Sequence, residues 1–174
     1  MNVKISLSGF FCNTWPDCVV VCNGHTIFQD KIINDNIIDF TIDFSADNLL
    51  TIGMTNKLMG ENSVYDILLD AHNNIIEDKY IKVNDILFDD VSVDNLIHEF
   101  VFIKDSNEKI STSGNINYNG SIHIPFQQPI YDWLIQEKYI KKEIQETNYQ
   151  GFGSWNNKFN YDVQDLIKKL ETIV

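Results

Sequence analysis

An aromatic ring lies among small polar groups in residues 10–17. Trp15 stands beside Pro16, with Asn13 and Asp17 within two residues of it. A tryptophan at a loop tip can stack on a sugar ring or anchor a protein interface. Neighbouring amide and carboxylate groups can orient the ligand. We therefore predict a ligand-binding site at Trp15, Asp17 and Asn13. The same residues also allow Trp15 to fold back and cap the body of the protein.

Carboxylate and amide side chains recur at three further places. Glu61 and Asn62 fall in a predicted loop, Asp66 in the strand after it, and Asp89 and Asp90 at the end of an apolar run. Such groups supply the oxygen ligands that Ca²⁺ prefers. No EF-hand pattern joins them, so a calcium site requires the fold to bring the three places together. The alternative is a solvated acidic surface.

Signatures of catalysis are missing from the sequence. None of the four histidines, His25, His72, His98 and His123, belongs to an HExxH motif or to a pair with metal-ligand spacing. The sequence contains no GxSxG, GxxxxGK or GxGxxG motif. Carboxylates are so abundant that any one pair is expected by chance. We predict that the protein is not an enzyme.

The charge excludes two classes of partner. The chain of 174 residues has 13 basic residues, all lysines, against 25 acidic ones, for a net charge of −12. Such a surface disfavours nucleic acid and anionic lipid, because both require a cationic face. We see no signal peptide and no run long enough to span a membrane. The three cysteines, Cys12, Cys18 and Cys22, have no CxxC spacing and are predicted to be buried thiols.

Period-2 alternation dominates residues 1–128 and predicts strands. It is clearest in residues 3–8 and 38–44. Asn23-Gly24 and Asn119-Gly120 each lie between apolar runs, which predicts two hairpins with type I′ turns. Many short strands at this spacing predict one domain, an antiparallel β-sandwich. The in-phase residues predict its core: Ile5, Leu7, Val19, Val21, Phe40, Ile42, Leu50, Ile52, Ile67, Leu69 and Ile124.

Two later strands are predicted with less regular patterns. In residues 80–93 the alternation slips between Val83 and Ile86, which indicates a bulge near Asn84 and Asp85. Residues 98–104 are predicted to form the next strand.

The pattern becomes helical in residues 129–174. Apolar residues at helical spacing predict short helices over residues 130–146 and 162–174, joined by a Gly- and Asn-rich loop. This extension either covers one end of the sandwich or docks onto a partner, and we favour a neighbouring subunit. The predicted interface consists of Trp133, Phe152, Trp155, Leu166 and Leu170.

The order of elements in residues 18–93 carries a resemblance. A strand leads into Asn-Gly, and a Leu-Thr-Ile-type strand, a loop with Glu and Asn, and an aromatic-Asp strand follow before an Asp-rich turn. These stretches are residues 19–24, 49–52, 61–62, 65–66 and 86–91. The chain thereby resembles small calcium-dependent xylan-binding carbohydrate-binding modules. The resemblance implies a jelly-roll-like sandwich, a glycan ligand and Ca²⁺ as the candidate cofactor.

A second resemblance covers nearly the whole chain. Through residues 8–10, 23–24, 86–93 and 129–134 the chain resembles uncharacterised proteins of large tailed phages of marine bacteria. Abundant Asn, Ile and Lys with little Ala or Pro indicate an AT-rich genome, which agrees with that source. The main hypothesis is a structural protein located in the virion, with other virion proteins or further copies of itself as partners. The alternative is a carbohydrate-binding module.

Overall fold

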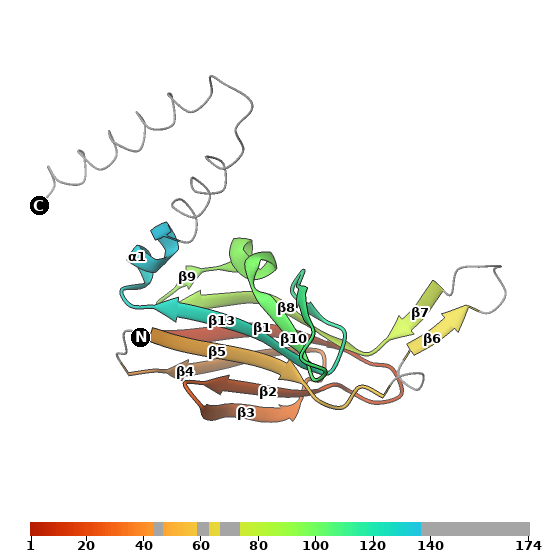
Figure 1. The fold of residues 1–174 in the computed structure, drawn as a ribbon. Coiled ribbons are helices and arrows are strands. Elements are labelled where there is room, and N and C mark those ends of the chain that lie inside the picture. The colour runs from red at the N-terminus through yellow and green to blue at the C-terminus, as the bar shows by residue number, and fades with distance from the viewer. Residues whose placement is uncertain (44–46, 59–62, 67–73, 137–174) are drawn as a thin grey trace, which may run out of the picture. The chain divides into compact units, whose positions relative to one another are not determined.

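The computed structural model describes residues 1–43, 47–58, 63–66 and 74–136. Two antiparallel sheets face each other, which confirms the predicted β-sandwich (Figure 1). The five-stranded sheet consists of β1 (Asn2–Phe10), β4 (Asp35–Thr41), β8 (Tyr80–Phe88), β9 (Val91–Ser92) and β12 (Asn115–Ile116). The six-stranded sheet consists of β2 (Asp17–Cys22), β3 (His25–Lys31), β5 (Asp47–Met54), β10 (Val101–Lys104), β11 (Lys109–Ser111) and β13 (Gly120–Gln127).

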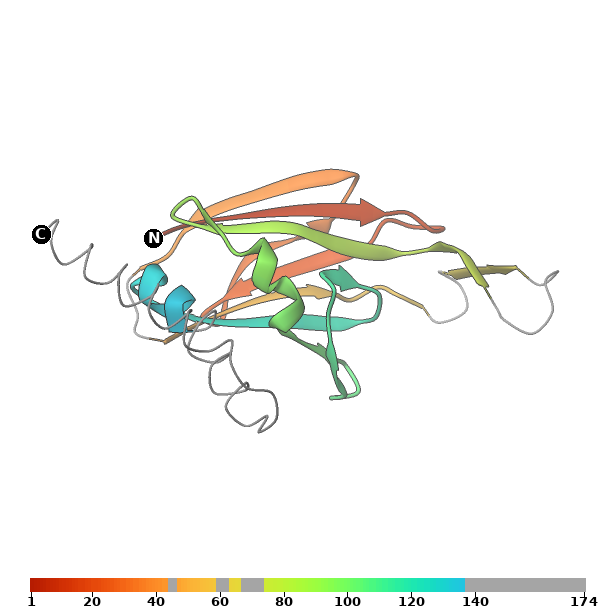
Figure 2. The same ribbon diagram turned by 90° about the horizontal axis from the view of Figure 1, so that it is seen from above.

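Four shorter elements, two strands and two helices, complete the described part of the chain. The strands β6 (Ser63–Asp66) and β7 (Asn74–Asp78) pair as a hairpin that extends beyond the sandwich (Figure 2). A 3₁₀ helix, η1, covers Asp94–Glu99, and α1 covers Ile130–Ile135. Within the described residues, neither helix has the length and apolarity needed to cross a membrane.

The core lies between the two sheets and follows the alternation of the strands. Val3, Ile5 and Leu7 of β1 are fully buried, while the residues between them are partly exposed. β1 lies between β4 and β8 in the sheet. From the opposite sheet, Leu50, Ile52 and Ile124 are buried as predicted. Strand periodicity therefore identifies the core face wherever polar and apolar residues alternate.

The predicted core is wrong for β2. Cys18, Val20 and Cys22 are the buried residues, and Val19 and Val21 face outward. Both faces of this strand are apolar, so periodicity cannot distinguish them. Pairing with β5 decides the face, because it places Val20 opposite the buried Ile52.

Four other predicted core residues either need correction or fall outside the described residues. Phe40 and Ile42 are only half-buried and pack at the side of the core. Phe40 belongs to β4, which is an edge strand, so one of its sides lacks a neighbouring strand. Ile67 and Leu69 lie outside the described residues.

The two Asn-Gly pairs have different roles. Asn23 and Gly24 have φ of 51° and 80°, which confirms the predicted type I′ turn between β2 and β3. Asn119 and Gly120 join strands of different sheets, because β12 pairs with β8 whereas β13 pairs with β10 and β5. The predicted second hairpin is therefore wrong. Glycine is required at 120 because φ is 137° and a Cβ would lie 2.2 Å from the Ile103 oxygen.

The irregularity in β8 is confirmed, whereas the strand at 98–104 begins later than predicted. Ser6 lies opposite Asp85 and Leu7 opposite Val83, so Asn84 is the extra residue of a bulge. His98 belongs to η1 rather than to a strand, and β10 begins at Val101.

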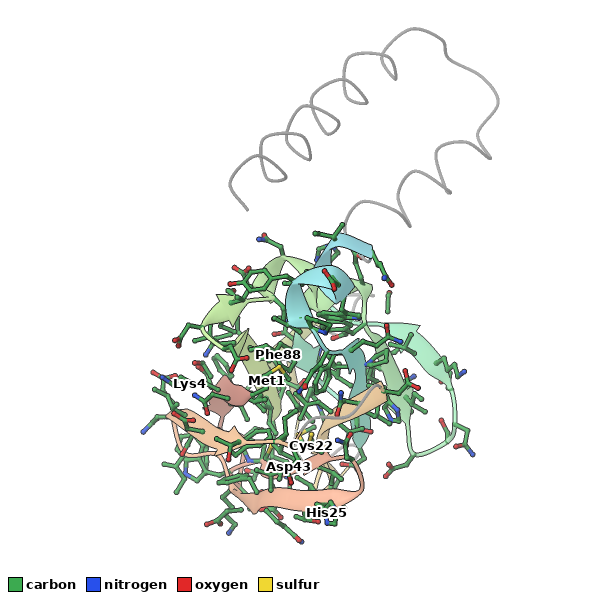
Figure 3. The ribbon with its side chains drawn as sticks, turned by 90° about the vertical axis from the view of Figure 1, so that its left-hand side faces the viewer. Met1, Lys4, Cys22, His25, Asp43 and Phe88 are labelled. Carbon is green, nitrogen blue, oxygen red and sulfur yellow. The ribbon has the colours of Figure 1, made fainter. Side chains whose placement is uncertain are left out.

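Helix α1 packs on the sandwich instead of extending from it. Ile130 and Trp133 are each 5 % exposed. The Trp133 ring lies 6.3 Å from the ring of Phe88, which itself lies 4.6 Å from Phe126. Figure 3 looks onto this end, with Phe88 labelled beneath α1. Trp133 is therefore a core residue, and its predicted role in an interface is wrong.

The compact unit that contains the sandwich is Met1–Leu134, so it includes most of α1. The rest of the predicted extension, with Phe152, Trp155, Leu166 and Leu170, lies outside the described residues. The predicted interface at those four residues remains a prediction.

Candidate functional site

Four aromatic side chains gather at the end of the sandwich away from α1. In the pairing of β1 with β8, Val3 lies opposite Phe88 and Phe10 lies opposite Tyr80. Because Phe88 contacts α1, Phe10 and Tyr80 mark the other end of both strands. The loop of residues 11–16, which leads from β1 to β2, adds two more rings. We call Phe10, Phe11, Trp15 and Tyr80 the aromatic patch.

The aromatic patch consists of two ring pairs. Phe10 and Tyr80 stack with centroids 4.0 Å apart and an interplanar angle of 8°. Phe11 and Trp15 meet edge to face, with centroids 5.3 Å apart. Phe10 is 38 % and Phe11 54 % exposed, and Trp15 is half-buried. Ring surface therefore remains accessible to a ligand, and Trp15 does not fold back into the core.

The side-chain amide of Asn56 holds the backbone of this loop. Its Nδ2 donates to the Trp15 carbonyl at 3.0 Å, and its Oδ1 accepts from the Asp17 backbone N–H at 3.0 Å. One amide therefore bonds the residues on both sides of Pro16, which fixes the path of the chain at Trp15.

Two buried lysines lie under the loop. Lys79 is 1 % exposed, and its Nζ donates to Thr14 Oγ1 at 3.0 Å and to the Asn56 carbonyl. Lys57 is 8 % exposed, and its Nζ lies 2.5 Å from Asp78 Oδ1. Burial lowers the pKa of Lys79, which the nearby Asp17 opposes. A buried ammonium is tolerated only with such partners.

Asn119 connects the same region to β13. Its Oδ1 accepts from the Lys57 backbone N–H at 2.7 Å, and its Nδ2 donates to the Lys57 carbonyl at 2.9 Å. We call Asn56, Lys57, Asp78, Lys79 and Asn119 the polar hub. Through Thr14, Trp15 and Asp17 the polar hub holds the loop in one conformation.

The predicted ligand-binding residues lie together at this loop. Asn13 is exposed with φ of 61°, and Asp17 begins β2 on its outward face. Sequence reasoning missed Phe10, Tyr80 and Lys79. Tyr80 reaches the loop only through strand pairing, 65 residues after Trp15 in the chain. A single lysine between two strands gives no sequence signal of burial.

The predicted calcium ligands are not brought together. Asp89 and Asp90 form the turn between β8 and β9, where Asp89 Oδ1 accepts from the Asn2 backbone N–H at 2.6 Å. Asp66 pairs with Asn74 in the hairpin beyond the opposite end of β8 (Figures 1 and 2). The nine residues of β8 separate them by roughly 30 Å at about 3.3 Å per residue.

A single ion cannot bridge that distance, so the predicted five-residue calcium site is wrong. Glu61 and Asn62 lie outside the described residues. Within the described ranges, no group of three or more His, Cys, Asp or Glu side chains is arranged to hold a metal ion.

The thiols are unsuited to nucleophilic chemistry. Cys12, Cys18 and Cys22 are buried and form no disulfide. Burial raises the pKa of all three, to about 12 for Cys18. For Cys12, Glu77 and Asp78 raise the pKa further, against Lys57 and Lys79. The thiolate, which is the reactive form, is therefore disfavoured at neutral pH.

Two solved structures are similar to this chain. One is vCBM60 in complex with galactobiose, at 14 % identity and a TM-score of 0.44, covering 71 % of this chain and 96 % of that one. The other is the selenomethionine form of vCBM60, from work on two families of calcium-dependent carbohydrate-binding modules. It is 13 % identical, with a TM-score of 0.44, and covers 70 % of this chain and 87 % of that one.

Neither a protein-family model nor a curated protein matches the chain. A phage source is not tested by these comparisons and stays a prediction.

Proposed function

We propose that the protein binds a neutral glycan at the aromatic patch and does not modify it. The observation that supports this most is that Phe11 and Trp15 present ring surface on a loop fixed by partly buried hydrogen bonds from Asn56 and Lys79. A loop held in one conformation loses little entropy when a ligand binds, so most of the contact energy contributes to affinity.

The chemistry of the patch suits a sugar. A sugar ring has faces of C–H groups that stack on aromatic rings, and an edge of hydroxyls. Asn13 and Asp17 border the rings and can donate to and accept from those hydroxyls. Near the loop, Asp17, Glu77 and Asp78 outnumber Lys57 and Lys79, and the whole chain has a net charge of −12. A neutral glycan is therefore favoured over an anionic one.

The test is a titration calorimetry screen of neutral oligosaccharides, including galactobiose and xylo-oligosaccharides, with acidic oligosaccharides as the comparison. We expect binding of a neutral ligand, weakened roughly tenfold by Trp15→Ala, which corresponds to about 1.4 kcal/mol. Tyr131→Ala is the matched control, because Tyr131 is an aromatic residue, 63 % exposed, on α1 at the other end. Equal affinities of wild type and Trp15→Ala would overturn the proposal.

Calcium is not required by this proposal. The predicted ligands are separated by the length of β8, so they do not form a site beside the aromatic patch. We expect the same glycan affinity in EDTA and in millimolar Ca²⁺. A loss of affinity in EDTA would show that a calcium ligand set other than the predicted one operates.

The virion location and the assembly role stay predictions. They rest on composition, on the resemblance to phage proteins and on Phe152, Trp155, Leu166 and Leu170. Mass spectrometry of purified phage particles checks them directly and independently of glycan binding.

A further inference from the structure

A groove of about 590 Å³ crosses the outer face of the six-stranded sheet. Its floor comes from β2, β5 and β13, and its wall from the end of β10 and the turn that follows. The lining residues that carry the argument are Val19, Thr51, Gly53, Ile103, Ser121 and His123. No residue of the aromatic patch lines the groove, so it is a separate feature of the surface.

The groove exists because the middle of the sheet lacks large side chains. Gly53 lies opposite Val19 on one side and Ser121 on the other. A Cβ at Gly53 would lie 2.9 Å from the Gly120 oxygen and 3.2 Å from the Ser121 Cβ, so close packing requires glycine there. The floor of the groove between Val19 and Ser121 is therefore backbone, as a consequence of how closely β5 pairs with β13.

The wall beside this gap is held in place. The Lys104 backbone N–H donates to the Glu108 carbonyl at 3.0 Å, and the Lys104 Nζ lies 2.8 Å from Glu108 Oε2. The same ammonium lies 4.5 Å from the centroid of the Tyr118 ring. Asn107 has φ of 64°, and its N–H closes the turn onto the Lys104 carbonyl at 2.8 Å.

The floor of the groove combines aliphatic surface with neutral hydrogen-bonding groups, and Lys104 and Asp105 belong to the wall. Val19 and Ile103 are half-buried and apolar. Ser121 Oγ lies 3.0 Å from His123 Nε2, and Thr51 adds a second hydroxyl. Burial and the nearby Lys109 lower the pKa of His123, so its imidazole is neutral at neutral pH. This floor fits a ligand with hydroxyl groups and C–H faces, and the wall adds one cationic and one anionic residue, Lys104 and Asp105, whose formal charges cancel.

The groove leads toward the aromatic patch. Asp17, Val19 and Val21 share the outward face of β2, and Thr55, which lines the groove, donates its N–H to the Asp17 carbonyl at 3.3 Å. From Val21 to Asp17 this face of β2 extends roughly 13 Å, at about 3.3 Å per residue, and Val19 and Val21 are its residues that line the groove. Trp15 lies two residues before Asp17 in the chain, so the groove and the aromatic patch both lie near the start of β2.

We propose that the groove is a second subsite for the same neutral glycan, so that the protein binds an extended oligosaccharide. One sugar stacks at Trp15, and the following units lie over Gly53 toward Ser121 and His123. The proposal rests on the proposed function at the aromatic patch. It adds the prediction that affinity rises with the length of the oligosaccharide.

The experiment measures affinity for xylo- and galacto-oligosaccharides, from the monosaccharide to the hexasaccharide, by titration calorimetry. The groove variant is Thr51→Phe, which fills the groove with a residue that strands accept. The matched control is Thr41→Phe, at an exposed position of β4 in the other sheet. We expect affinity to rise roughly tenfold from the shortest bound ligand to the longest in the wild type and in Thr41→Phe.

In Thr51→Phe we expect that gain to be lost while the shortest bound ligand keeps its affinity. Thr51→Ser, which leaves the groove open, should show the same gain of affinity with oligosaccharide length as the wild type. Suppose that the wild-type affinity does not depend on oligosaccharide length but that Trp15→Ala lowers it. This result would overturn the second subsite in the groove and would agree with glycan binding at the aromatic patch. Absence of binding to any oligosaccharide would overturn the proposed function and the groove with it.

Discussion

The two ends of the sandwich are closed by opposite kinds of chemistry. At one end, Ile130 and Trp133 of α1 cover Phe88 and Phe126 with apolar contacts. At the other end, the polar hub closes the sandwich under the aromatic patch, with an ammonium that is 1 % exposed at Lys79. At the second end two ring pairs, Phe10–Tyr80 and Phe11–Trp15, lie beside the polar hub, whereas at the first end the exposed ring is Tyr131 of α1.

This difference indicates a division between stability and recognition. Apolar burial stabilises in proportion to area and tolerates small shifts of the side chains. Hydrogen bonds to a buried ammonium demand one geometry, and they stabilise little beyond the cost of desolvation. The polar hub therefore contributes mainly the shape of the loop, whereas the α1 end contributes free energy of unfolding.

The largest loss in the free energy of unfolding is expected for a substitution at the α1 end. Trp133→Ala should lower the free energy of unfolding by about 3–5 kcal/mol, because it removes a buried aromatic ring from Phe88. Tyr131→Ala in the same helix should change it by less than about 0.5 kcal/mol, since that side chain is exposed. Denaturation by urea measures both. Similar small losses for the two variants would show that α1 does not pack on the sandwich in solution.

A smaller loss of stability, with a larger loss of binding, is expected at the polar hub. Lys79→Met leaves Thr14 and the Asn56 carbonyl without their donor, which should cost about 1–3 kcal/mol. The loop that carries Trp15 should then loosen, and glycan affinity should fall, whereas Trp133→Phe should leave affinity unchanged. Lys82→Met, an exposed position of β8, is the control. An unchanged glycan affinity in Lys79→Met would show that the polar hub does not contribute to glycan binding.

The smallest effect concerns alkaline pH. The pKa of Lys79 is lower in the folded protein than its ordinary value. At a pH between the folded and the unfolded pKa, the unfolded chain therefore binds more protons than the folded protein does. Stability from this group therefore rises as pH increases through the folded pKa toward the unfolded value. As the pH rises, the free energy of unfolding of the wild type should accordingly increase relative to that of Lys79→Met. Urea denaturation at several pH values measures this difference. The difference between wild type and Trp133→Phe should not depend on pH, and a parallel shift in both would contradict the assignment.

The sequence by itself determined the features that depend on neighbouring residues. The alternation in β1, the type I′ turn at Asn23-Gly24 and the bulge at Asn84 all follow from a few adjacent side chains, and each is present as predicted. The fold class follows from many such segments together. The placement of Trp15 in a loop also follows from local signals, namely Pro16 and the polar residues around it, whereas the sequence allows its ring either to project or to fold back.

Tertiary structure alone decided which distant segments meet. Val19 and Val20 are identical in type, and only the pairing of β2 with β5 places one outward and the other in the core. Burial of Lys79 depends on Thr14 and Asn56, which reach it from other parts of the chain. The separation of Asp66 from Asp89 depends on the length and direction of β8. Local propensity acts over a few residues, whereas burial and the assembly of a site depend on contacts between segments far apart in the sequence.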